Sequence, residues 1–194
     1  MEKYELIPTP SSLMESMREI GYSTETAVAD LVDNCITSKA NLIHVRYSWN
    51  DAKPWLAVID DGDGMDIDGL IEAMKMGSVS PIIERDLDDL GRFGLGMKTA
   101  SLSQSRSFLV LSKKDGHYSI AEWDLDSFGD DKDNKWLINI YNYKEIDSIL
   151  KNLNEQYLGD CDNGTIVYWN KIDRIDVGDS PKHQESKFNE VLMS

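Results

Sequence analysis

The sequence predicts an α+β fold, a two-layer sandwich in which a mixed β-sheet is covered by helices on one face. Segments rich in β-branched and aromatic residues recur along the chain, and turn-forming residues bound each of them. Between them lie segments whose apolar residues repeat with helical spacing. At 194 residues the chain is long enough to bury a core of its own. We therefore expect one domain over residues 1–175, followed by a tail or linker over residues 176–194.

The first helix is expected over residues 25–38. Its apolar residues recur at helical spacing, and they are Ala27, Val28, Leu31, Val32, Cys35 and Ile36. Thr24 stands just before this stripe and is a suitable N-cap. Further helices are expected over residues 67–76, from Gly94 to about residue 102, and within residues 182–194.

The strands are expected in five segments that carry β-rich composition. These are "NLIHVRYSW" (41–49), "PWLAVID" (54–60), "SFLVLSKKDGHYSIAEWDL" (107–125), "KWLINIYNY" (135–143) and "GTIVYWNKI" (164–172). Within the third segment, "KKDG" has the composition of a hairpin turn and divides it into two strands.

Charge and cysteine content limit the partners of this chain. Lys and Arg number 20 against 35 Asp and Glu, giving a net charge of −15, which repels a nucleic-acid backbone. The two cysteines lack metal-ligand spacing, and no signal-like or membrane-length apolar stretch occurs. We expect a cytoplasmic protein that contacts neither nucleic acid nor membrane.

The stretch "VIDDGDGMDIDG" (58–69) is dense in acids and glycines, which suits a calcium loop, a nucleotide-binding turn or an acidic surface bend. An EF-hand loop needs an oxygen ligand at its fifth position and glycine at its sixth. Counted from Asp61, those positions hold Met65 and Asp66. A calcium loop is therefore disfavoured, and the other two interpretations stay open.

A second cluster, "LGRFGLGMKTAS" (90–101), contains three glycines. A P-loop needs lysine directly after its last glycine, but Met97 separates Gly96 from Lys98. The order G-x-x-G-x-G also differs from the dinucleotide fingerprint G-x-G-x-x-G. What is left is a glycine-rich bend that leads into a helix, whose free N–H groups and Lys98 suit a phosphate.

The third cluster is Asp30 and Asn34 on the first helix. Residues four apart project from one helical face, which is either solvated or turned inward over a site. In the second case the Asn34 oxygen could bind Mg²⁺, while the Asp30 carboxylate one turn away positions water.

Taken in order, these clusters resemble the motifs of the Bergerat-fold ATPases, the GHKL superfamily of gyrase B, the ninety-kilodalton heat-shock chaperone, histidine kinases and MutL. "ADLVDN", "DDGDGMD", "GRFGLGMKTAS" and "GTIVYW" look most like the microrchidia-type, MutL-type and chaperone-type members. The resemblance spans Thr24 to Trp169 and implies the Bergerat two-layer sandwich, with ATP and Mg²⁺ as cofactors.

The resemblance also implies roles for individual residues. Asp60 would accept a hydrogen bond from the adenine amino group, and Thr165 would reach the base through a bridging water. The full nucleotide-binding set comprises Asn34 (which also binds the metal), Asp60, Gly62, Gly64, Met65, Gly91, Gly94, Leu95, Gly96, Lys98 and Thr165. Residues 77–90 would form the nucleotide lid. The other acids of the second motif, Asp61, Asp63, Asp66 and Asp68, are expected to be solvated or structural.

Asp30 stands where this superfamily usually has its general base, a glutamate. The side chain is one methylene shorter, so the resemblance implies slow ATP hydrolysis. It also implies a nucleotide-dependent homodimer and further domains or partner proteins beyond this chain. The alternative is a switch that senses ATP without hydrolysing it. A histidine-kinase domain that transfers phosphate is disfavoured, because the late Gly-Thr strand fits the gyrase-like and chaperone-like members better.

Overall fold

Six strands form one sheet in the order β1-β2-β6-β3-β4-β5, and all five neighbouring pairs are antiparallel. The computed structural model describes residue 4 and residues 8–19, 22–50, 52–77, 96–129, 135–175 and 184–193. The strands are β1 Ile43–Ser48, β2 Trp55–Asp60, β3 Ser105–Lys114, β4 His117–Asp124, β5 Asn139–Ile140 and β6 Gly164–Ile172. The α+β fold class is confirmed.

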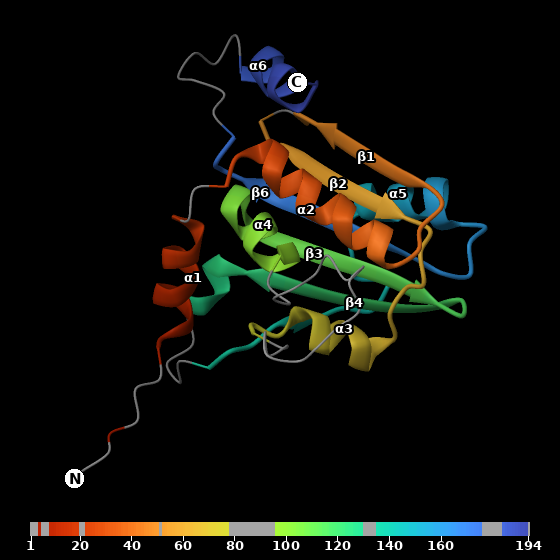
Figure 1. The fold of residues 1–194 in the computed structure, drawn as a ribbon, viewed down its shortest axis with the longest axis horizontal. Coiled ribbons are helices and arrows are strands. Elements are labelled where there is room, and N and C mark those ends of the chain that lie inside the picture. The colour runs from red at the N-terminus through yellow and green to blue at the C-terminus, as the bar shows by residue number, and fades with distance from the viewer. Residues whose placement is uncertain are drawn as a thin grey trace.

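The helices are α1 Pro10–Arg18, α2 Thr24–Thr37, α3 Ile67–Met74, α4 Gly96–Gln104, α5 Ser148–Leu158 and α6 Gln184–Met193, with a 3₁₀ turn at Leu125–Gly129. Figure 1 shows α2, α3 and α4 in front of the sheet and α5 behind it. Within the described part of the chain, no helix has the length and apolarity that a membrane crossing requires.

The face of the sheet under α2, α3 and α4 is built from rows of residues that pair across β2, β6, β3 and β4. Two rows are apolar and lie in the core: Leu56, Trp169, Phe108, Trp123 and Val58, Val167, Val110, Ala121. The third row is polar throughout: Asp60, Thr165, Ser112, Ser119. Because paired residues share a face, this register places a buried polar row beside the apolar core.

Helix α5 covers the opposite face, with Leu150, Leu153 and Leu158 in a second apolar cluster. Neither α5 nor α1 was predicted from the sequence. The segment 135–143, predicted as a strand, pairs with β4 only at Asn139–Ile140. Its apolar side chains Trp136 and Ile138 instead pack against the main core from outside a strand.

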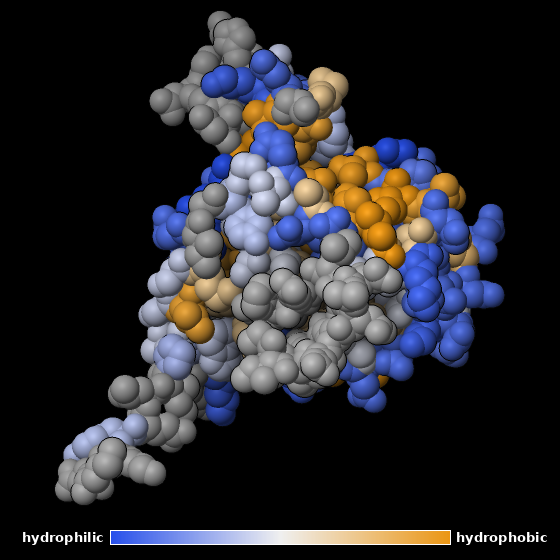
Figure 2. All heavy atoms as spheres, viewed as in Figure 1, coloured by the Kyte–Doolittle hydropathy of each residue, from blue (hydrophilic) through white to orange (hydrophobic). Residues whose placement is uncertain are grey.

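Two expectations about α2 were wrong in detail. The N-cap is Ser23, whose hydroxyl accepts a hydrogen bond from the Thr26 N–H at 3.2 Å, so Thr24 is the first helical residue. Ile36 was assigned to the apolar stripe but is 55% exposed. Figure 2 shows hydrophobic side chains gathered on the surface over the end of α2 and over β1, where Ile36 and Leu42 are exposed.

Helix α6, predicted within residues 182–194, packs on the edge of the sheet. Phe188 is fully buried there, with its ring centroid 6.0 Å from that of Tyr47 and 5.6 Å from that of Trp49. Helix α6 therefore contacts the main body through this aromatic cluster.

The loop after β2 uses its acids to hold the backbone, as expected for those that follow Asp60. Oδ1 of Asp61 accepts hydrogen bonds from the N–H groups of Asn41 and Leu42, at 2.7 and 2.8 Å. Asp66 is the N-cap of α3 and accepts from the Gly69 N–H at 2.8 Å. These carboxylates fasten the loop to the start of β1 and to α3.

Gly64 lies where this loop passes the end of β3. Its φ is +61°, and a Cβ placed there would lie 2.0 Å from the carbonyl oxygen of Lys113. Gly116 in the predicted hairpin turn also has a positive φ, +76°, but a Cβ there would meet open space. The glycine at 64 is thus required by a contact within the protein.

These two glycines give a matched pair for stability. Gly116→Ala should lower the free energy of unfolding by about 1–2 kcal/mol, the cost of a left-handed backbone for alanine. Gly64→Ala should cost about 2–4 kcal/mol because a steric clash adds to the same backbone term. Urea denaturation of both variants measures the difference. Equal losses of unfolding free energy in the two variants would mean that the loop can shift at Gly64 and relieve the clash.

Candidate active site

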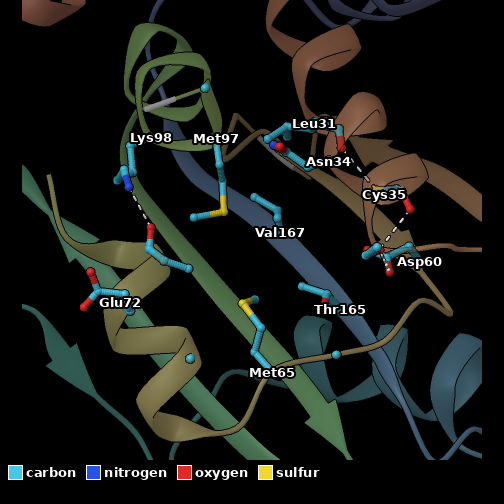
Figure 3. A pocket seen from close by; sticks show the side chains of 15 residues that line it. Leu31, Asn34, Cys35, Asp60, Met65, Glu72, Met97, Lys98, Thr165 and Val167 are labelled. Atoms are coloured by element: carbon cyan, nitrogen blue, oxygen red, sulfur yellow. Dashed lines mark hydrogen bonds between the residues drawn. The ribbon is translucent and has the colours of Figure 1, made fainter. Parts of the chain in front are cut away.

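A cavity of about 460 Å³ lies between α2, α3, α4 and the polar end of the sheet. Figure 3 shows Asn34, Cys35 and Asp60 on one side of it, Lys98, Met97 and Glu72 on the other, and Thr165 with Val167 on the floor. Seven residues of the predicted nucleotide-binding set line this cavity: Asn34, Asp60, Gly64, Met65, Gly96, Lys98 and Thr165. Four separate segments of the chain therefore meet at one place.

Asp60, the last residue of β2, is the buried anionic group of this cavity. It is 5% exposed, and its Oδ1 accepts a hydrogen bond from the Gly62 N–H at 2.9 Å. Burial raises the pKa of this carboxyl, while the Gly62 N–H and the Cys35 and Ser38 side chains oppose that rise. The site therefore holds a largely buried carboxyl group that can accept a hydrogen bond from a ligand's donor.

Thr165 pairs with Asp60 across β2 and β6 and connects it to the rest of the polar row. Its hydroxyl lies 3.0 Å from that of Ser112, which in turn accepts a hydrogen bond from the Met65 N–H at 2.8 Å. The chain of contacts joins the floor of the cavity to the loop that carries Gly64 and Met65. Floor and loop are thereby held in a fixed relation.

Asn34 lines the cavity one turn before Ser38 on α2. Its Nδ2 is buried without a hydrogen-bond partner within the described residues. In the same described part of the chain, no group of three or more His, Cys, Asp and Glu residues is arranged to hold a metal. An amide offers its nitrogen to an acceptor such as phosphate and its oxygen to a cation, so this side chain suits Mg²⁺ bound with phosphate, an ion that takes one or two protein oxygens.

Lys98 lies in the first turn of α4 and is 1% exposed. Its ammonium donates to the carbonyl oxygens of Ala73 and Lys75, at 2.7 and 2.6 Å, and so caps the C-terminal end of α3. Burial lowers its pKa from 10.5 to about 8, and the nearby Glu72 carboxylate works against this. The cation expected to face phosphate is thus also a structural cap.

Asp30 does not line the cavity, although Asn34 one turn later does. Its carboxylate interacts instead with the hydroxyl of Tyr22, which Thr99 on α4 also influences. Burial and this carboxylate raise the pKa of Tyr22, against the effect of Thr99. The residue expected to act as base is therefore held toward the junction of α2 and α4.

This geometry agrees with a match to a known family. Residues 22–159 match the profile of the family described as histidine kinase-, DNA gyrase B-, and HSP90-like ATPase. The chain belongs to this family.

A relative of this ATPase domain is the ATPase morc-1 of Caenorhabditis elegans. It is 30% identical over 91 residues, which make up 47% of this chain and 10% of that protein. The chain thus matches only a small part of the relative's length. The predicted resemblance to GHKL ATPases is confirmed, and a microrchidia-type protein is among the relatives.

The part of the family's glycine motif before Gly96 lies outside the described residues. Gly91, Gly94 and Leu95 fall there, and so does the predicted lid from residue 78 to residue 90. Gly62, the other predicted residue absent from the lining, is buried behind Asp60, where a Cβ would lie 2.2 Å from the Ser38 hydroxyl oxygen. Its role in this ATPase domain is to let the loop pack on α2.

Sequence reasoning missed several residues of the cavity wall. Three of them lie on α2: Leu31, Cys35 and Ser38. Together with Asn34 they follow the i, i+3, i+4, i+7 spacing of one helical face. That spacing could have identified them, but Leu31 and Cys35 were assigned to the core stripe alone.

The buried ammonium of Lys98 gives a pH-dependent stability. Between its folded pKa of about 8 and its ordinary value of 10.5, the unfolded chain binds a proton that the folded chain has released. Stability from this group therefore rises with pH in that window. From about pH 7.5 to 9.5, wild type should gain about 1–2 kcal/mol of unfolding free energy relative to Lys98→Met.

Urea denaturation at the two pH values measures this gain. Lys75→Met is the matched control, because the Lys75 side chain is 59% exposed and should show no such change relative to wild type. If the difference in unfolding free energy between wild type and Lys98→Met is the same at both pH values, Lys98 keeps an ordinary pKa.

Proposed function

We propose that this domain binds ATP with Mg²⁺ and hydrolyses it slowly, with lid closure and dimerisation driving a larger protein. The observation that carries the proposal is the buried Asp60 carboxylate, paired with Thr165 on the floor of a cavity, in a chain of an ATPase family. An acceptor placed in this way suits the exocyclic amino group of adenine. Leu31 and Val167 offer apolar surface for the ring.

The remaining roles follow from the order of residues around the cavity. Asn34 would supply an amide oxygen to Mg²⁺, which when bound neutralises phosphate charge. Lys98 and the start of α4 at Gly96 would face the phosphates, because helix N–H groups and an ammonium both favour anions. The apolar α2 and sheet residues exclude water from the base end of the cavity.

Asp30 is proposed as the general base. A carboxylate one turn from Asn34 lies near the metal end of the cavity, and a base must come within hydrogen-bond reach of the attacking water. Helix geometry supplies the direction, whereas the short side chain and its interaction with the Tyr22 hydroxyl limit the reach. Slow turnover is the expected consequence.

A non-hydrolysing switch is the second candidate. The placement of Asp30 outside the cavity wall favours it, since a general base has to come within hydrogen-bond reach of the attacking water. ATP binding would then act only through closure of residues 77–90 and homodimerisation, without hydrolysis. In either case a cytoplasmic setting and partner domains outside this chain belong to the proposal.

Asp60 and its neighbour Asp61 give a direct test of nucleotide binding. Asp60→Asn replaces an anionic acceptor and should weaken ATP binding by about 1.5–3 kcal/mol. Asp61→Asn should leave affinity within about twofold, because Asp61 bonds backbone N–H groups of the protein and an amide oxygen can still accept. Isothermal titration with Mg·ATP measures both. Equal ATP affinities in wild type and in both variants would contradict the role assigned to Asp60.

Asp30 separates the slow enzyme from the switch. If Asp30 is the base, Asp30→Ala should lower the ATPase rate by about 10²-fold or more while ATP affinity stays nearly constant. Asp30→Glu should keep or raise the rate, since the longer side chain extends the reach. Phosphate release by the full-length protein is the measurement. A wild-type rate equal to that of Asp30→Ala favours the switch instead.

A further inference from the structure

Ser38 lies at the C-cap of α2, in the wall of the cavity, and its hydroxyl faces two acceptors. The Oγ is 2.9 Å from the carbonyl oxygen of Cys35 and 3.3 Å from Oδ1 of Asp60. A hydroxyl has one proton, so it can donate to the helix carbonyl or to the carboxylate. This side chain therefore contacts Asp60, the residue proposed to bind the base.

The loop after β2 is packed closely onto Ser38. The Asp63 N–H donates to the Ser38 carbonyl oxygen at 2.9 Å, and Gly62 approaches so closely that a Cβ would lie 2.2 Å from the Ser38 Oγ. The distance between this hydroxyl and Asp60 is therefore fixed by backbone contacts on both sides. The backbone keeps the two groups close together, and the direction of the Ser38 hydroxyl proton is the part of the contact that can change.

Donors converge on one oxygen of Asp60. The Gly62 N–H and the Ser38 hydroxyl both point to Oδ1, which leaves Oδ2 as the oxygen for a ligand's donor. The Gly62 N–H belongs to the backbone and cannot turn away. The Ser38 hydroxyl can, and the Cys35 thiol likewise has an alternative acceptor in the Leu31 carbonyl oxygen at 3.2 Å.

Two titratable groups adjoin this carboxyl. The Asp61 carboxylate raises the pKa of Asp60, while the Cys35 thiol acts with Ser38 to lower it. Glu72 and Lys98 lie on the far side of the cavity and act on each other. Two side chains of the described residues stabilise the ionised form, with a larger effect from the Cys35 thiol than from the Ser38 hydroxyl. Ser38 is the one of the two that does so with a hydroxyl, which is the better hydrogen-bond donor.

The protonation state of Asp60 decides which purine fits. An ionised carboxylate accepts from an amino group and repels a carbonyl oxygen at the same place. A protonated carboxyl can instead donate to that carbonyl. A site with an ionised Asp60 therefore prefers a 6-amino purine over a 6-oxo purine, and protonation weakens this preference.

We propose that Ser38 is a positioning residue that holds the Asp60 carboxylate as an acceptor and thereby sets the preference of the cavity for 6-amino over 6-oxo purine nucleotides. This inference rests on the proposed nucleotide binding. It assigns a selectivity role to the last turn of α2, which carries Asn34 at one end and Ser38 at the other. One helix thus connects the metal end of the site to its base end.

The test compares Ser38→Ala with Thr37→Ala. Thr37 is a matched control because its hydroxyl donates to the Asp33 carbonyl oxygen, at 3.0 Å, within the helix and away from Asp60. Carbon NMR of the Asp60 carboxyl in the ligand-free protein should show its titration midpoint raised by about one pH unit in Ser38→Ala. Thr37→Ala should match wild type. Coincident titrations of Ser38→Ala and wild type would overturn the proposal.

Affinities for ATP and inosine triphosphate, measured by isothermal titration across the same pH range, give the second readout. In Ser38→Ala, the loss of ATP affinity on acidification should begin about one pH unit higher, and preference for ATP should fall up to about tenfold there. Ser38→Thr, which keeps the hydroxyl, should match wild type in the pH dependence of ATP affinity and in the preference for ATP. Ser38→Val, which has the shape of threonine without the hydroxyl, should behave like Ser38→Ala. An unchanged preference in Ser38→Ala overturns the selectivity role.

Failure of the proposed function is recognised separately. If wild type binds neither nucleotide, nucleotide binding and the selectivity role both fall. The ligand-free titration still decides whether Ser38 holds the Asp60 carboxylate.

Discussion

The site depends on the register between β2 and β6, which pairs Asp60 with Thr165. The same register places Leu56 beside Trp169 and Val58 beside Val167, two pairs of the core. A slip of one residue would turn the apolar rows out of the core and the polar row out of the cavity together. Core packing, by fixing the register of β2 and β6, therefore also fixes the position of the buried Asp60 carboxyl group.

Much of this arrangement could be predicted from the sequence because its signals are local. The spacing along α2 predicted the helix, and β-rich segments bounded by turns predicted β1, β2, β3, β4 and β6. The order of three motifs predicted a single site, and the cavity brings together Asn34, Asp60, Lys98 and Thr165. That prediction came from resemblance to a family, since each motif alone was ambiguous.

What escaped prediction depends on contacts between distant parts of the chain. The cap that Lys98 forms requires the C-terminal carbonyls of α3 to end beside α4. The need for glycine at position 64 comes from the Lys113 carbonyl oxygen, which belongs to another strand. Segment 135–143 has the composition of a strand, yet tertiary packing uses Trp136 and Ile138 in the core. Composition cannot reveal such partners.

The cap that Lys98 forms on α3 means that phosphate would compete with protein for one ammonium group. A ligand that draws this group away must replace two short hydrogen bonds to Ala73 and Lys75. The affinity observed for a triphosphate would then be a difference between two sets of interactions, and a weak value would not imply a poor fit. The same exchange would loosen the end of α3, although the Trp123 indole, which donates to the Met74 carbonyl oxygen at 3.0 Å, would still contact that turn. Ligand binding and the stability of the end of α3 would therefore be thermodynamically coupled.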